Sequence, residues 1–273
     1  MKAVVGGRIL TITHGEIPDG VLLFDGGKIV RAERGLTLPP GTEVIDAAGK
    51  YVAPGLIDCH VHIGARGFMG ETNNPISPAP RAVDCIDFTD PGWQEAVEGG
   101  ITTVITTPGS GNIMSGTSIC LKTAGPGLPQ RTLREPAGLK MAWRKGMERP
   151  SQGPPYPMTF MGVAGALRNA LVDCQNYMQR REKGDVPEDL GQERLAQVLR
   201  RELPARIHIF TPVEILALLR IVDEFGFDFT IEHGFEAYLI ADELARRAVP
   251  VIYGPLGDDS RRHALFPRRG KHG

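Results

Sequence analysis

Two patterns of apolar and polar positions divide the chain near residue 55. Before that point, three β-like runs over 3–13, 20–32 and 43–52 are separated by turn residues such as Gly15, Pro18-Asp19-Gly20 and Asp25-Gly26-Gly27. After it, short apolar strands alternate with helical stretches, which is typical of an α/β fold with parallel strands. We therefore predict a small N-terminal β unit over 1–54, too small to be stable alone, and a second domain over 55–253.

The second domain is predicted to have about seven strands. They are expected at 56–62, 101–107, 138–142, 205–210, 227–233 and 249–253, with a further one at 82–86. Helices are expected over 161–181, from Asp90-Pro91 to Gly99-Gly100, and from the capping box at Thr211 to Gly226. About seven strands in roughly 220 residues predict an α/β (β/α)8 TIM-type barrel that is incomplete, with strand eight missing. The remaining residues, 254–273, are predicted to be a basic irregular tail.

Composition and charge narrow the classes of function. The 273 residues are 41% hydrophobic, and 31 Lys and Arg balance 32 Asp and Glu to a net charge of −1. This excludes disorder and provides no field that would attract nucleic acid or an anionic membrane. No apolar run approaches the roughly 20 residues of a membrane helix, and Gly6-Gly7-Arg8 interrupts the N-terminal stretch. We expect a cytoplasmic protein with a small-molecule partner and no nucleic-acid or membrane partner. The widely spaced cysteines (Cys59, Cys85, Cys120 and Cys174) are predicted to be free core thiols.

The strongest chemical signal is an apolar strand that ends in two histidines, Pro-Gly-Leu-Ile-Asp-Cys-His-Val-His over 54–62. Because side chains alternate along a strand, His60 and His62 share one face with Asp58. They stand at the carboxyl end of the strand, where the active sites of barrels form. Paired imidazoles at such a place suit a divalent transition metal.

Two more predicted strands end in a histidine, at His208 and His233. If the strands are parallel, three or four imidazoles meet at one rim and form a zinc site; taken singly, either histidine has a structural role as its alternative. The other histidines, His14, His263 and His272, lie in turns or in the tail and are predicted to be solvated. By alternation, Lys140 faces away from Leu139 and Met141. It either lies inside the barrel with a partner or reaches solvent from the strand end.

These segments resemble the metal-dependent amidohydrolases, in particular the imidazolonepropionase-like and prolidase-like branch. The resemblance rests on the signature at 54–62, on Gly100-Ile101-Thr102-Thr103-Val104 with Pro108-Gly109-Ser110, on 137–142 and on Ile231-Glu232-His233-Gly234. It implies that His60, His62, His208 and His233 hold one or two divalent ions, most often zinc. It also implies that Lys140 is the position most like the carboxylated lysine that bridges two metals in some members. The implied reaction is attack of a metal-activated water on an amide or cyclic amide.

The departures from the family pattern define the alternatives. Strand five has one histidine, followed by Ile209-Phe210, and 143–155 is unlike the family's substrate loop. The strand-eight aspartate has no counterpart, because Asp258 and Asp259 follow strand seven too closely, so the catalytic residue is unknown. The C-terminal strands that normally complete the small β unit are absent too. We therefore expect a truncated or frame-shifted member with little activity, poor folding and unpaired strand edges. Such edges favour aggregation or pairing with another chain, as in a homo-oligomer.

Two other functions remain open at this point. The first is a non-catalytic, metal-binding remnant of the same family, which leaves open whether the chain is an enzyme. The second is a phosphate-binding barrel enzyme. It has less support, because neither a P-loop nor a dinucleotide-binding glycine fingerprint occurs, and Gly109-Ser110-Gly111 is weak evidence by itself.

Overall fold

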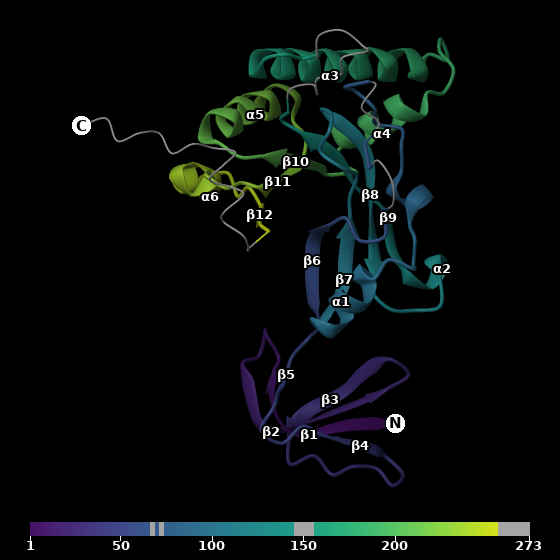
Figure 1. Cartoon of the computed structure of the whole chain (residues 1–273), viewed down its shortest axis with the longest axis vertical. Helices are drawn as coiled ribbons and strands as arrows, with labels where there is room; N and C mark the ends of the chain where they lie inside the picture. The colour runs from purple at the N-terminus through teal and green to yellow at the C-terminus, as the bar shows by residue number, and fades with distance from the viewer. Residues whose placement is uncertain (66–68, 71–73, 145–155, 256–273) are drawn as a thin grey trace, which may run out of the picture. The chain divides into compact units, whose positions relative to one another are not determined.

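The computed structural model describes residues 1–65, 69–70, 74–144 and 156–255. The chain forms two compact units, Met1–Leu56 and Ile57–Gly273. Figure 1 shows the strands of the first unit and the larger sheet with helices of the second. Within the described ranges, no helix has the length and apolar content needed to cross a membrane.

The first unit is a five-stranded sheet in the order β3-β2-β1-β4, with β5 also paired to β1. Its strands are β1 (Lys2–Leu10), β2 (Glu16–Asp25), β3 (Lys28–Arg34), β4 (Glu43–Asp46) and β5 (Tyr51–Val52). The predicted run over 20–32 is therefore two strands, joined by a turn in which Gly26 and Gly27 have φ of 54° and 76°. The turn predicted at Pro18-Asp19-Gly20 is wrong, because these residues lie inside β2: Gly20 pairs with Gly7 of β1 and Arg34 of β3, and Pro18 and Asp19 fall at a shift in the β1–β2 register.

The second unit contains a seven-stranded sheet in the order β12-β11-β10-β9-β8-β7-β6. Its strands are β6 (Leu56–Val61), β7 (Ile101–Thr106), β8 (Met114–Lys122), β9 (Thr132–Ala142), β10 (Ala205–Ile209), β11 (Phe229–His233) and β12 (Val251–Tyr253). The pairs from β9 to β12 are parallel, whereas β8 is antiparallel to both β7 and β9. The predicted α/β class is confirmed, and β8 is the exception to the expected parallel order.

Three predicted helices are present with their expected end signals. The helical segments are η1 (Ala82–Cys85), α1 (Gly92–Glu98), α2 (Leu128–Arg131), α3 (Phe160–Glu182), α4 (Leu190–Leu199), α5 (Pro212–Phe225), η2 (Ala237–Ile240) and α6 (Ala241–Arg246). At α5, Thr211 and Glu214 form the capping box, and Gly226 ends the helix with a left-handed φ of 72°. The sequence analysis did not identify α4.

Two predictions about the strands were wrong for identifiable reasons. The segment 82–86 is the 3-10 helix η1 and the residue after it, held by Arg81, whose side chain bonds Asp84 and whose carbonyl accepts the Asp84 amide. Strand β8 was missed because six of its first residues, from Met114 to Ile119, are buried on both faces. A strand buried on both faces lacks the apolar and polar alternation that identifies a half-exposed strand.

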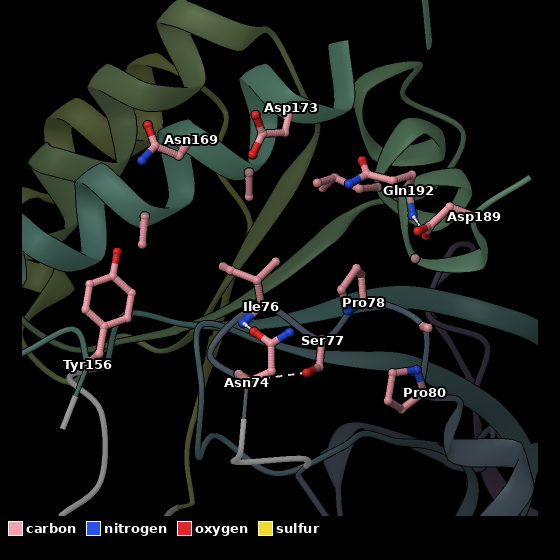
Figure 2. Close-up of a pocket in the computed structure, with 15 residues that line it drawn as sticks. Asn74, Ile76, Ser77, Pro78, Pro80, Tyr156, Asn169, Asp173, Asp189 and Gln192 are labelled. Atoms are coloured by element: carbon pink, nitrogen blue, oxygen red, sulfur yellow. Dashed lines mark hydrogen bonds between the residues drawn. The ribbon is translucent and has the colours of Figure 1, made fainter. Parts of the chain in front are cut away.

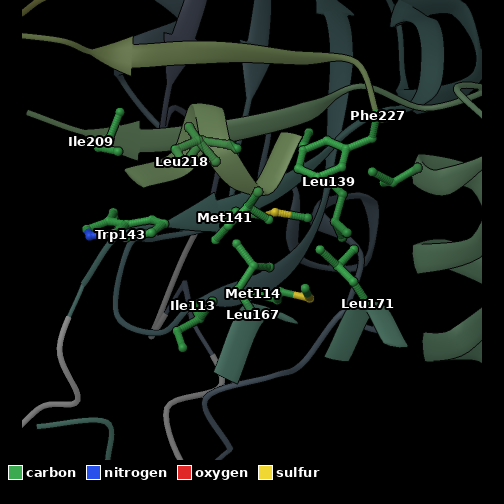
Figure 3. Packing of buried hydrophobic residues seen from close by; sticks show 14 of the residues in the cluster. Ile113, Met114, Leu139, Met141, Trp143, Leu167, Leu171, Ile209, Leu218 and Phe227 are labelled. Atoms are coloured by element: carbon green, nitrogen blue, oxygen red, sulfur yellow. The ribbon is translucent and has the colours of Figure 1, made fainter. Parts of the chain in front are cut away.

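The main core lies between one face of the sheet and the helices α3, α4 and α5 (Figure 3). Leu139 and Met141 of β9 and Ile209 of β10 pack there with Leu171 and Leu218 of the helices. Because strand side chains alternate, the residues between them face the other side of the sheet. Burying large aliphatic side chains at roughly 25 cal/mol per Å² is what stabilises this layer. The free cysteines differ: Cys174 is in this core, whereas Cys85 is exposed, so the prediction of core thiols is wrong for Cys85.

A substitution at Gly116 of β8 tests whether the close approach of the segment at Pro80 constrains the fold. Its φ is 102°, and an added Cβ would overlap the Pro80 carbonyl, lying 2.8 Å from its carbon. We expect Gly116→Ala to lower the free energy of unfolding by about 2 kcal/mol or more, because strain and overlap act together. Gly165→Ala is the matched control: its Cβ meets nothing within 4 Å, and in α3 alanine should stabilise by up to about 1 kcal/mol. Urea unfolding of both variants measures the difference; equal midpoints would contradict the assignment of a constraint at Gly116.

Candidate functional site

Four histidines from three strands meet on the polar side of the larger sheet. The ring centroids of His60 and His62 are 5.3 Å apart, those of His60 and His233 are 4.7 Å apart, and those of His208 and His233 are 4.5 Å apart. His60 belongs to β6, His208 to β10 and His233 to β11, and His62 follows β6 directly. The structure thus brings together all four histidines that the sequence proposed as ligands.

Strand alternation explains three of these positions but not the fourth. His208 pairs with Glu232 across the β10–β11 ladder, so these two residues share a face, and His233 should point the opposite way. His233 instead has a φ of 74°, in the left-handed region that non-glycine residues seldom adopt. The resulting change of chain direction brings its ring against those of His60 and His208.

Oxygen atoms hold the Nδ1 side of three of the rings. His62 Nδ1 lies 2.8 Å from the Thr107 carbonyl oxygen, and His233 Nδ1 lies 2.8 Å from that of Gly254. A carbonyl oxygen can only accept, so each Nδ1 carries the proton and donates it, which leaves Nε2 with its lone pair in the neutral ring. His208 Nδ1 is hydrogen-bonded to the Ser110 hydroxyl at 3.0 Å. Histidines that bind metals in proteins usually have such a partner on the other nitrogen.

The site keeps these imidazoles neutral. Burial, together with the smaller effect of the neighbouring His233, lowers the pKa of His208 to about 2. Burial lowers the pKa of His233 to about 4, although its bond to the Gly254 carbonyl opposes this. Burial also lowers the pKa of His62. Neutral imidazole is the form that binds metal ions.

A buried carboxylate that the sequence analysis did not single out lies beside the histidines. Glu232 is fully buried, and its Oε2 is 2.5 Å from His60 Nδ1 and 3.0 Å from Lys140 Nζ. Its Oε1 is 2.6 Å from Arg206 Nη2, which also donates to the Cys59 carbonyl of β6. Burial by itself would raise the pKa of Glu232, but His60 and the two cations lower it to about 2.

Lys140 is inside the protein and paired. Its side chain has 0% exposure, so the alternative in which it reaches solvent is wrong. Burial lowers its pKa, and the charge of Glu232 opposes that effect. Arg206 passes over Gly138, where an added Cβ would overlap the arginine side chain. The glycine therefore leaves room for Arg206 to reach Glu232.

A cavity of about 630 Å³ opens beside the histidines. Its lining includes Asp58, His60 and His62 from the β6 segment, His233 from β11, and Tyr253 from β12. Asp58 Oδ1 accepts a hydrogen bond from the His60 amide at 3.0 Å, which fixes the backbone of β6 next to the two histidines. The cavity therefore lies where the two outermost strands of the sheet come near the same set of imidazoles.

The four imidazoles are chemically suitable ligands for a metal ion, although their nitrogen atoms are not already arranged around one point. Among the described residues, no three His, Cys, Asp or Glu side chains are close enough to form one. In the same part of the chain, neither ring nitrogen of His60 has a hydrogen bond of acceptable angle; Nδ1 makes its short contact with Glu232, and Nε2 is buried without a partner. A buried ring nitrogen without a hydrogen-bond partner, next to three neutral imidazoles, suits a divalent ion.

A second cavity, of about 780 Å³, lies between the 74–80 segment and helices α3 and α4 (Figure 2). Its polar side chains already support local structure: Asn74 Oδ1 accepts from the Ile76 amide, and Asp189 caps α4 by accepting from the Gln192 amide. The described residues that line it include none of the four histidines. The chemistry suggested by the sequence therefore belongs to the first cavity.

Several residues named from the sequence are not part of this site. His14 is exposed in a turn of the first unit. His263, His272, Asp258 and Asp259 lie outside the described residues, as does most of the 143–155 loop.

Comparison with known proteins identifies the family. No protein-family model matches the chain. The crystal structure of an amidohydrolase from Thermotoga maritima MSB8 is 33% identical, with a TM-score of 0.86, over 94% of this chain and 70% of that one. The chain belongs to the amidohydrolase superfamily. A prolidase crystallised with n-methylphosphonate-L-proline has the same fold at a TM-score of 0.51 and 18% identity, over 92% of this chain and 65% of that one.

Curated amidohydrolase relatives are much longer than the matched region. Amidohydrolase tasK of Hapsidospora irregularis is 26% identical over 268 residues, which cover 83% of this chain and 27% of that protein. A dihydroorotase of Pelobacter propionicus is 37% identical over 86 residues, which cover 32% of this chain and 20% of the enzyme. The chain thus spans about a quarter or less of these relatives.

The neutral histidines make the stability of the metal-free protein depend on pH. The folded pKa values of His208 and His233, about 2 and about 4, lie below the ordinary value of 6.5. Below pH 6.5 the unfolded chain takes up protons that the folded protein does not, so stability is complete above that pH and falls as the pH decreases towards 4. Each histidine contributes at most about 1.4 kcal/mol per pH unit.

The pH dependence of the unfolding free energy can be measured by urea unfolding from about pH 7.5 to about pH 4.5, because histidines of the unfolded chain take up protons within this range. We expect the unfolding free energy of His208→Asn to change less with pH than that of the unmodified protein. His14→Asn, which changes an exposed histidine, should keep the original slope. If His208→Asn also keeps it, the buried neutral state assigned to His208 is wrong.

Proposed function

We propose that this protein is a metal-dependent hydrolase that cleaves C–N bonds in amides or cyclic amides by means of a metal-activated water. The observation that carries the proposal is the meeting of four imidazoles, two of which donate Nδ1–H to backbone carbonyls and so direct Nε2 away from them. The amidohydrolase and dihydroorotase relatives support the reaction class.

In the proposed site His60, His62, His208 and His233 hold the ion. Imidazole nitrogens on strand ends suit zinc, which would lower the pKa of a bound water towards neutrality. Residues of this chain orient the rings. Thr107, Gly254 and Ser110 hold three of them through Nδ1, and the buried Lys140–Glu232–Arg206 cluster lies beside His60. The substrate is a small molecule that enters the 630 Å³ cavity.

The first test is the metal content. Purified without chelators and with zinc supplied, the protein should retain about one equivalent of zinc or more, because several imidazoles bind together. Replacing both His60 and His62 by alanine should abolish retention, whereas His14→Ala should not change it. Elemental analysis gives the stoichiometry. Less than roughly a tenth of an equivalent in the unmodified protein would contradict the site.

Activity separates the proposal from its alternative. The zinc-loaded protein should hydrolyse members of a panel of amides and cyclic amides, with the double histidine variant as the blank. Zinc binding with no turnover on the whole panel would instead support a metal-binding protein without catalysis.

Lys140 is the candidate for a second ion in this proposal. If the unmodified protein binds two zinc ions, Lys140→Met should reduce the number to one, because the bridging side chain is lost. If it binds one, the number should stay at one, and Lys140 is then a partner of Glu232 alone. A protein that binds two ions both with and without Lys140 would remove this residue from the ligand set.

A further inference from the structure

Each of the four histidines has an oxygen atom beside Nδ1, and three kinds of group supply these oxygens. Backbone carbonyls serve His62 and His233, and the Ser110 hydroxyl serves His208. For His60, the oxygen is Oε2 of Glu232, at 2.5 Å. His60 is therefore the ring whose Nδ1 partner is a charged side chain.

We propose that Glu232 is a positioning residue that keeps the proton of His60 on Nδ1 and so presents the buried Nε2 as an open donor. The proposal rests on the proposed function for what Nε2 binds, and on the contacts of Glu232 alone for the tautomer. Glu232 itself is not placed among the ligands.

The contacts of Glu232 show why it can act in this way. Lys140 and Arg206 carry only donors, and they contact both carboxylate oxygens, at 3.0 Å and 2.6 Å. Two cations at such distances hold the carboxylate ionised, and an ionised carboxylate can only accept. The ring nitrogen that faces it is then the one that bears hydrogen, and in the neutral ring the other nitrogen keeps its lone pair.

The position of Glu232 in the sheet also favours this positioning role. Glu232 is in β11, and its partners come from β6, β9 and β10, so the contact fixes His60 relative to the strands that carry His208 and His233. His60 is nearly buried, with a side-chain exposure of 11%, and its Nε2 has no partner among the described residues. A ring without a carboxylate beside Nδ1 could present either nitrogen.

The tautomer can be measured in the metal-free protein by long-range ¹H–¹⁵N NMR of ¹⁵N-histidine, with the His60 signals assigned by their loss in His60→Ala. We expect His60 to be Nδ1-protonated in the unmodified protein. In Glu232→Gln the neutral amide can donate as well as accept, so a substantial Nε2-protonated population should appear. Zinc affinity, measured by competition with a chelator, should fall roughly 10- to 100-fold, the usual effect of losing the partner of a ligand histidine. Glu243→Gln, which removes a partly exposed carboxylate paired with Arg246 and Arg247, should change neither result.

A second variant guards against a general loss of structure. Glu232→Gln leaves Lys140 and Arg206 without their counter-ion and is expected to lower the thermal transition. Lys140→Met/Glu232→Gln returns the cluster to its original net charge and should recover part of that transition while the His60 tautomer stays mixed. Recovery of the original tautomer in the double variant would overturn the proposal and leave Glu232 a role in charge balance only.

The outcomes separate this proposal from the proposed function. If the unmodified protein shows the Nδ1 tautomer, lost in Glu232→Gln, but binds no zinc, the positioning role stands and the metal site fails. If zinc binds tightly and Glu232→Gln changes neither the tautomer nor the affinity, the metal site stands and the positioning role is wrong.

Discussion

Glu232 is a carboxylate with no access to water, and the need to pair its charge constrains the polar side of the larger sheet. Removing an ion from water costs several kcal/mol unless close partners replace the lost solvation. Here the partners are His60, Lys140 and Arg206, each from a different strand. Strand β6 stands at one end of the strand order and β11 next to the other, so the sheet has to curl for His60 to reach Glu232. The same curl brings His60 to His233.

The inward position of Glu232 also accounts for the unusual backbone of its neighbour. Two successive residues of a regular strand face opposite sides, so His233 could not join the other histidines by alternation. The left-handed φ of 74° resolves the conflict, at a cost of about 1–3 kcal/mol for a residue other than glycine. The hydrogen bond from Nδ1 to the Gly254 carbonyl offsets part of this cost. Strain at this one residue thus permits a buried anion and a histidine to serve the same site.

The sequence predicted what strand alternation controls and missed what long-range contacts control. It indicated the shared face of His60 and His62, because that follows from a period of two within one strand. By the same alternation it turned Lys140 away from Leu139 and Met141, but it left open whether the lysine lies inside the protein or reaches solvent. It gave no partner for Lys140, because Glu232 is 92 positions away along the chain and no local pattern links the two. One available signal was an acid and an arginine inside apolar strands, at Glu232 and Arg206, since such charges are seldom buried unpaired. Strand β8 left no periodic signal, because both its faces are buried.

The two faces of the central strands have different roles, one in stability and the other in supporting the histidine site. Leu139, Met141, Ile207 and Ile231 point into the layer shared with the helices, where apolar burial stabilises the fold. Lys140, Arg206 and Glu232 alternate with them on the other face, where a network of ions contributes little stability and apolar residues of similar volume would often serve as well or better. Stability therefore does not explain the charges. Their position does: the cluster lies directly behind His60, and removing the carboxylate would leave two buried cations beside the imidazoles. The charged face is better understood as the support of the histidine site than as part of the core.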